Sequence, residues 1–144
     1  MTRNPTSASS KGRVVMAAPY TLKKLTDIED AAPKSGFGDI QEARFAKDTL
    51  DTKDTGFSYH RVKAGQRQPF GHKHERAEEV YVVLGGAGRI KLDDEIVELE
   101  ALDAIRVAPE VTRAFEAGPN GLDLLAFGPR REGDGEVLMG WWAE

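Results

Sequence analysis

The sequence of 144 residues contains no cysteine. This absence excludes disulfide bonds, thiolate nucleophiles and sulfur-ligated metals together, so any metal site must be built from histidine and carboxylate side chains. It also mildly favours a reducing compartment, and we therefore expect a cytoplasmic protein.

Long apolar runs and an excess of positive charge are absent as well. The run Val80 to Leu84 is far shorter than the roughly 20 residues needed to cross a bilayer, and Val14 to Ala18 is too short for a signal peptide. Lysine and arginine number 20 against 24 acidic residues, which gives a net charge of -4. Binding to nucleic acid requires a basic excess. The composition therefore predicts neither a membrane partner nor a nucleic-acid partner.

The remaining composition, 40% hydrophobic and 31% charged, is typical of a single folded domain of this length. The N-terminal residues have few large apolar side chains, and we predict a flexible tail over residues 1–19. Met16 is followed by a sequence typical of a domain start, so a start-site extension before it is an open alternative. Residues 20–144 are predicted to form one domain.

Helix signals are confined to the start of that domain. Thr26 and Glu29 form a Ser/Thr-x-x-Glu capping box, which predicts a helix of about two turns that Pro33 and Gly36 end.

Beyond Gly36 the sequence favours β-strands, because glycine and proline recur between runs of alternating apolar and polar residues. Asp93 and Asp94 separate two such runs and predict a hairpin turn. About eight to ten short antiparallel strands fit, and hence an all-β sandwich, jelly roll or small barrel. Residues 78–84 are apolar on both faces after an acidic pair, which predicts a covered outer face and a homodimer. The clearest runs are 40–46, 57–63, 89–99 and 122–127.

Two of the three histidines, His72 and His74, are two residues apart. On a strand both imidazoles would leave the same face, with Glu79 within reach from the next strand. Two histidines and one carboxylate are a ligand set for divalent iron, and with water they can hold zinc, manganese or nickel. The spacing alone also fits two partly exposed histidines in a polar loop.

The stretch around these histidines resembles the first motif of the cupin superfamily, which runs Gly, His-x-His, Glu and Gly. The matching positions are Gly65, His72, His74, Glu79 and Gly86, with one extra residue between the first glycine and the first histidine. The resemblance implies a small single-domain cupin, that is, a closed all-β double-stranded β-helix (a jelly-roll barrel) with a short N-terminal arm and helix. Its core motifs lie within residues 57–127.

The second cupin motif is expected about fifteen residues later, and here it is degenerate. The family's Gly, Pro, Gly, His and Asn are replaced, in that order, by Leu102, Ala108, Glu110, Arg113 and Ala117. In metal-binding cupins the histidine of this motif is the fourth protein ligand. Arginine cannot give up its proton to coordinate a metal, so a site with four protein ligands is excluded.

Three interpretations of Arg113 stay open. In the first, a divalent metal lies on His72, His74 and Glu79, and Arg113 binds the carboxylate or phosphate of a ligand. In the second, the guanidinium replaces the metal and pairs with Glu79 in a metal-free pocket. In the third, Arg113 points outward and the site is a relic. Because a metal beside Arg113 leaves excess positive charge, metal affinity should depend on an anionic ligand.

Three further side chains are candidates for the site. Tyr81 shares the face of Glu79 and Phe115 that of Arg113, so both are expected to contact the ligand, although a core position also fits Tyr81. His60 is a substitute metal ligand in only one of the two possible strand phases.

Near the C-terminus, Trp141 and Trp142 are expected to be packed rather than solvated. They predict a clasp over the barrel or a dimer contact, with a ligand-stacking lid as the alternative. The preceding residues 130–136 are polar and glycine-rich, which predicts a mobile surface loop.

Together these features predict a small-molecule-binding cupin with a pocket of His72, His74, Glu79 and Arg113. The pocket is suited to a polar or anionic ligand, with or without iron, manganese, nickel or zinc. One alternative is a metal-dependent cupin enzyme of dioxygenase, isomerase or epimerase type. A second is a structural or interaction protein. Cupins carry out many reactions, so the fold selects neither a substrate nor a catalytic residue.

Overall fold

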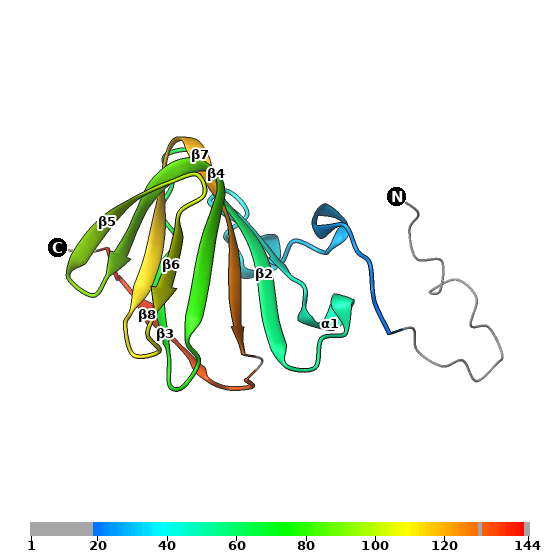
Figure 1. Cartoon of the computed structure of the whole chain (residues 1–144). Helices are drawn as coiled ribbons and strands as arrows, with labels where there is room; N and C mark the ends of the chain where they lie inside the picture. Colours follow the sequence, from blue (N-terminus) through cyan, green and yellow to red (C-terminus); the bar gives the residue numbers. More distant parts are fainter. Residues whose placement is uncertain (1–18, 130, 143–144) are drawn as a thin grey trace.

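The computed structural model describes residues 19–129 and 131–142. The predicted tail lies outside the described residues except for Pro19. The described chain is all-β, as predicted, with antiparallel strands (Figure 1). It has three very short helices. The strands are β1 (Gln41–Phe45), β2 (Thr55–Val62), β3 (Phe70–His74), β4 (Glu79–Leu92), β5 (Glu95–Glu100), β6 (Ala104–Val107), β7 (Arg113–Pro129) and β8 (Gly135–Met139), and the helices are η2 (Leu25–Asp27), η3 (Pro33–Ser35) and α1 (Lys47–Leu50).

The two longest strands, β4 and β7, pair along almost their whole length. The N-terminal half of β4 pairs with the C-terminal half of β7, from Val80 opposite Phe127 to Gly86 opposite Leu122. These halves belong to one layer, in the order β1-β2-β7-β4-β6. The other halves belong to a second layer, in the order β8-β3-β7-β4-β5. The two layers share β4 and β7, which produces the predicted jelly-roll arrangement.

Glycines mark the point where the β4–β7 ladder passes from one layer to the other. The register shifts between Gly86 and Gly88, opposite the segment 118–121. Gly86 has a φ of 72°, and a Cβ there would lie 2.0 Å from the carbonyl oxygen of Gly121. Only glycine combines a left-handed conformation with so close an approach of two backbones. The need for glycine at position 86, the last position of the first cupin-like motif, is therefore explained by the local backbone geometry.

The hydrophobic core fills the space between the layers. Tyr81 and Val83 of β4 are buried with Phe115, Leu122 and Leu124 of β7. The outer face of β4 is less well covered, because Val80 and Val82 are only half-buried and Leu84 is 45% exposed. The inward and outward side chains of the strand thus alternate as predicted, but the described residues cover its outer face only in part.

The hairpin at Asp93 and Asp94 is confirmed. Leu92 of β4 pairs with Glu95 of β5, so two residues form the turn. Asp93 has a φ of 49°, a left-handed conformation that aspartate tolerates in such turns.

The prediction of a two-turn helix from the capping box at Thr26 is wrong in length. The structure has only the three-residue helices η2 and η3 there, and Lys24, which precedes η2, makes no side-chain cap. Asp30 explains the difference, because its Oδ1 accepts hydrogen bonds from the backbone N–H groups of Ala32 (3.0 Å) and Ala43 (2.9 Å). These bonds tie the segment to β1 where a second turn would have formed. No helix within residues 19–129 or 131–142 has the length and apolar character needed to cross a membrane.

The sheet curls, but its edges do not meet. In the described part of the chain, β1 pairs only with β2 and β8 only with β3. The closed barrel expected from the sequence is therefore open between β1 and β8. Ala43 and Phe45 on one edge and Val137 on the other border a cavity, so the opening lies beside that cavity.

Trp141 and Trp142 form the predicted clasp. The indole Nε1 of Trp142 donates a hydrogen bond of 2.9 Å to the carbonyl oxygen of Gln68, and Nζ of Lys91 lies 4.6 Å from the ring centroid of Trp141. A Cβ on Gly71 would lie 2.6 Å from Cγ of Trp141, so glycine at this position makes room for the indole. The pair thus packs against the chain's own β3 and β4 and does not need a partner subunit.

Substitution of Gly86 tests the bend of the β4–β7 ladder. We expect Gly86→Ala to lower the free energy of unfolding by more than about 3 kcal/mol, because it combines backbone strain with a backbone clash. Gly65→Ala is the matched control, since Gly65 also has a positive φ (69°) but no heavy atom near the added Cβ; its cost should be about 1 kcal/mol. Equal losses in urea denaturation would contradict this account.

Candidate metal centre

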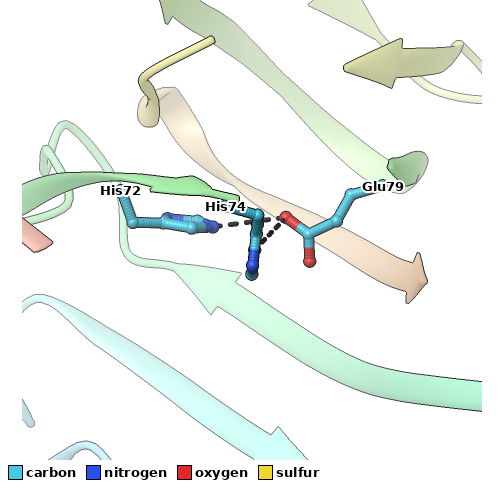
Figure 2. A group of neighbouring side chains, drawn as sticks. All are labelled: His72, His74 and Glu79. Atoms are coloured by element: carbon cyan, nitrogen blue, oxygen red, sulfur yellow. Dashed lines mark hydrogen bonds and ion pairs between the residues drawn. The ribbon is translucent and has the colours of Figure 1, made fainter. Parts of the chain in front are cut away.

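Three side chains from β3 and the start of β4 converge inside the sheet. His72 and His74 leave the same face of β3, and Glu79 approaches them from the first residue of β4 (Figure 2). The Nε2 atoms of His72 and His74 lie 3.3 Å and 3.1 Å from Oε1 of Glu79. One ligand atom from each of the three residues lies within 4.8 Å of the other two. The structure thus brings together the three residues that the sequence spacing predicted as metal ligands.

Oε1 of Glu79 is the point on which the local polar groups converge. The hydroxyl of Tyr81 donates a 2.5 Å hydrogen bond to this atom, and Nη2 of Arg113 lies 3.5 Å away. Burial alone would raise the pKa of Glu79, but the interactions with His72, His74 and Tyr81 outweigh burial and hold that pKa well below its usual range. Glu79 is thus an ionised carboxylate inside the protein.

Tyr81 is the hydrogen-bond donor in this group. Burial and the charge of Glu79 raise its pKa well above the usual value, so the phenol stays protonated. Behind it, the ring of Phe115 packs edge-on at 4.9 Å between centroids. Tyr81 borders the cavity described below, whereas Phe115 lies in the core and is not among the described side chains that line it.

Arg113, at the start of β7, lies directly opposite His72 of β3. Its exposed fraction is 0%, and Nη1 donates hydrogen bonds to the carbonyl oxygens of Val111 (2.7 Å) and Pro109 (3.3 Å). An outward-pointing Arg113, the third interpretation above, is therefore wrong. Arg113 also does not border the cavity, so in this geometry it acts on Glu79 and not directly on a ligand.

Asp134 is a residue of the site that sequence reasoning missed. Its Oδ2 lies 3.3 Å from Nδ1 of His74, and its two carboxylate oxygens accept hydrogen bonds from the backbone N–H groups of Arg76 and Ala77. The segment 130–136 was predicted to be a mobile loop, but its last residues begin β8 and Asp134 anchors it to the turn after β3. The sequence signal, a single Asp between two glycines, is typical of any polar turn.

The three converging side chains fit a divalent metal. In a site with metal–ligand bonds of about 2.1 Å, neighbouring ligand atoms are about 3 Å apart, close to the two distances that join the histidines to Glu79. Nε2 of His74 is buried and makes no hydrogen bond of good geometry with a described residue. A carboxylate near the second nitrogen of a ligating histidine, as Asp134 is for His74, is typical of metal sites because it orients the ring.

A cavity of about 370 Å³ opens onto the two histidines and Glu79, and we call it the apolar cavity. Apolar and aromatic side chains form much of its wall, including Phe45, Phe70 and Val137. Neither a lysine nor an arginine of the described chain lines it. A ligand anion here would thus find no side-chain cation, which differs from the pocket expected from the sequence.

His60 and Ser58 line the apolar cavity on the side of β2. Nε2 of His60 lies 2.8 Å from Oγ of Ser58. Burial, assisted by repulsion from His72, lowers the pKa of His60 to about 4, so the ring is neutral at pH 7. His60 faces the site but does not belong to the group of three converging ligands.

No protein-family model matches the sequence, and no curated protein matches it. Solved structures with the same fold include a cupin protein of Bacteroides fragilis (24% identity, 81% of this chain and 89% of that chain covered, TM-score 0.64). A polyketide cyclase of Streptomyces resistomycificus is similar over 86% of this chain and 87% of its own (21% identity, TM-score 0.69). A cupin-superfamily sugar phosphate isomerase of Silicibacter pomeroyi is similar over 71% and 78% (14% identity, TM-score 0.58). At these identities the likeness establishes the fold.

The low pKa of His60 predicts how the stability depends on pH. The unfolded chain binds this proton at about pH 6.5, whereas the folded protein binds it only near pH 4. The contribution of His60 to stability is therefore complete above pH 6.5 and is lost as the pH falls towards 4. We expect the wild type to lose about 2 kcal/mol more than His60→Gln between pH 7 and pH 4. Urea denaturation at each pH measures the difference, and parallel losses in the two proteins would refute the assignment.

Proposed function

Since the chain has the cupin fold, we propose that it binds a small organic molecule beside a divalent metal held by His72, His74 and Glu79. The observation that carries this proposal is the approach of two imidazole Nε2 atoms to within 3.3 Å and 3.1 Å of one carboxylate oxygen. The open cavity beside them supports a ligand site. The names of similar structures, a sugar phosphate isomerase and a polyketide cyclase, also refer to small-molecule chemistry.

Iron, manganese, nickel and zinc are all compatible with two imidazoles and one carboxylate. When bound, such a metal would act as a Lewis acid that polarises an atom of the molecule in the cavity. Asp134 lies 3.3 Å from Nδ1 of His74, close enough to orient the ring, and the protonated hydroxyl of Tyr81 donates a hydrogen bond to Oε1 of Glu79. Three protein ligands leave coordination positions open, as catalytic metal sites do. A metal-dependent enzyme of isomerase, epimerase or dioxygenase type is thus the alternative that this geometry favours.

A metal-free pocket is the second candidate, and Arg113 is the observation that favours it. Its guanidinium lies 3.5 Å from Glu79 and offsets the charge of this partly buried carboxylate without help from an ion. With a metal present, the same guanidinium adds a positive charge next to the divalent ion and weakens its binding unless an anion joins.

Metal titration of Arg113 variants separates the two candidates. We expect wild type to bind one zinc, manganese or nickel ion weakly, and Arg113→His to bind it at least about tenfold more tightly. The variant loses a repulsive charge and gains an imidazole opposite His72. Arg113→Met is the control that removes the charge without adding a ligand, and its affinity should lie between the two. Isothermal titration calorimetry at fixed pH gives these affinities.

Two further measurements make the titration decisive. His74→Asn should abolish binding if the ion lies on the proposed ligands, and circular dichroism confirms that each variant is folded. Tight binding by wild type that His74→Asn leaves intact would place the metal elsewhere. Binding by Arg113→His alone, with none by wild type, would favour the metal-free pocket.

We also propose that the protein is a homodimer that buries the outer face of β4, where Val82 is half-buried and Leu84 is 45% exposed. The apolar character of this face supports the proposal, whereas the two tryptophans no longer do, because they pack on their own chain. A cytoplasmic location stays a prediction from the composition.

Light scattering at micromolar concentration tests the dimer. We expect twice the mass of the 15.8 kDa chain, and we expect Leu84→Glu to shift the protein to monomer because a carboxylate in an apolar interface is costly. Ile96→Glu is the control, since Ile96 is similarly exposed (48%) but lies on β5. A wild type that is monomeric throughout this concentration range would contradict the proposal.

A further inference from the structure

A second pocket adjoins the apolar cavity and has the opposite electrostatic character. This pocket, about 200 Å³ in volume, lies where α1, the start of β2 and the end of β7 come together. It shares wall residues with the apolar cavity, among them Ser58, His74 and Glu79, so the two spaces are continuous beside the proposed metal ligands. Its own wall adds Lys47 and Arg131. We call it the cationic pocket.

The two cations are available to a ligand. In the described part of the chain, the partner of Lys47 is Glu132, whose Oε1 lies 3.5 Å from Nζ and whose side chain is 83% exposed. An ion pair this exposed contributes little to stability, so another carboxylate can replace Glu132 at small cost. Arg131 is exposed and makes no ion pair with the described residues.

The apolar cavity, in contrast, disfavours an anion. Neither a lysine nor an arginine of the described chain lines it; of its two acidic wall residues, Glu79 also lines the cationic pocket, and Glu136 is paired with Lys73 at 3.7 Å. His60 is neutral at pH 7. An uncharged, apolar group therefore fits this space better than a carboxylate, because a buried anion would find no side-chain cation there to pair with.

From this division of charge we propose that the ligand is an amphipathic organic acid. Its uncharged, largely apolar body occupies the apolar cavity, and its carboxylate occupies the cationic pocket between Lys47 and Arg131. This inference rests on the proposed function only because it places the ligand in the same site. It assigns the acid group to the two side chains and not to the metal, and it names a ligand class that the fold alone does not select.

The test compares probes that differ in one part of the molecule. 3-Phenylpropanoate carries body and carboxylate, 3-phenylpropanamide has the same shape without the charge, and acetate has the charge without the body. We expect the acid to bind at least about tenfold more tightly than either of the others, because each lacks one of the two matched contacts. Calorimetry is carried out on the full chain, both loaded with zinc and free of metal.

Variants of the cationic pocket should change the affinity for the acid in opposite directions. Lys47→Gln and Arg131→Gln should each weaken binding of the acid about tenfold and leave the amide unchanged. Glu132→Gln should strengthen binding of the acid a few-fold, because it frees Lys47 from its exposed partner. Lys53→Gln is the matched control and should change nothing, since Lys53 pairs with Asp51 and does not line either space.

The outcomes distinguish this inference from the metal proposal. Acid selectivity that is lost in Lys47→Gln, with or without zinc, supports the inference even if no metal binds tightly. Equal affinity for acid and amide would overturn it, and so would acetate binding as tightly as the acid. Selectivity that exists only in the zinc-loaded protein and survives Lys47→Gln would also overturn it, because the carboxylate would then lie on the metal.

Discussion

The antiparallel pairing of β4 with β7 is the constraint on which the rest of this protein depends. It belongs to both layers, so its bend sets how the layers face each other. It also fixes the site, because Glu79 begins β4 and Arg113 begins β7. A one-residue slip in this ladder would turn every side chain of one strand to the other face and separate the carboxylate from the histidines. The close backbone contact at Gly86 fixes the register in which Glu79 stays beside the histidines.

Two kinds of side chain approach the same carboxylate oxygen of Glu79. The imidazoles of His72 and His74 approach its Oε1 as fellow ligands of a metal would, while Arg113 approaches the same oxygen as a counter-ion. The guanidinium is held from behind by the carbonyl oxygen of Val111. It therefore cannot withdraw easily when an ion arrives. The positive charge at the site is thus built into the strand, and occupancy by a metal is coupled to whichever anion can offset that charge.

Much of this could be predicted from the sequence where the signal is local and periodic. Alternating residues indicated the strands, the turn at Asp93 and the inward face of β4, and the spacing of His72, His74 and Glu79 indicated that they converge. Other features depend on contacts between distant segments, which no local pattern encodes. The two-turn helix was lost because Asp30 bonds to the backbone of β1. Asp134 could not be predicted for the same reason: it meets His74 only because β8 pairs with β3.

That last contact links the proposed metal site to one of the free edges of the sheet. Edge strands with a single neighbour are the parts of a protein that open first in local fluctuations. β8 is such a strand, and the residue just before it, Asp134, is hydrogen-bonded to the turn after β3 and lies 3.3 Å from Nδ1 of His74. An ion that binds His74 in this position would favour the state in which this contact is intact, so by mass action it would lower the population in which β8 is frayed. Hydrogen exchange of the β8 amides would then report on the occupancy of a site to which β8 contributes no ligand.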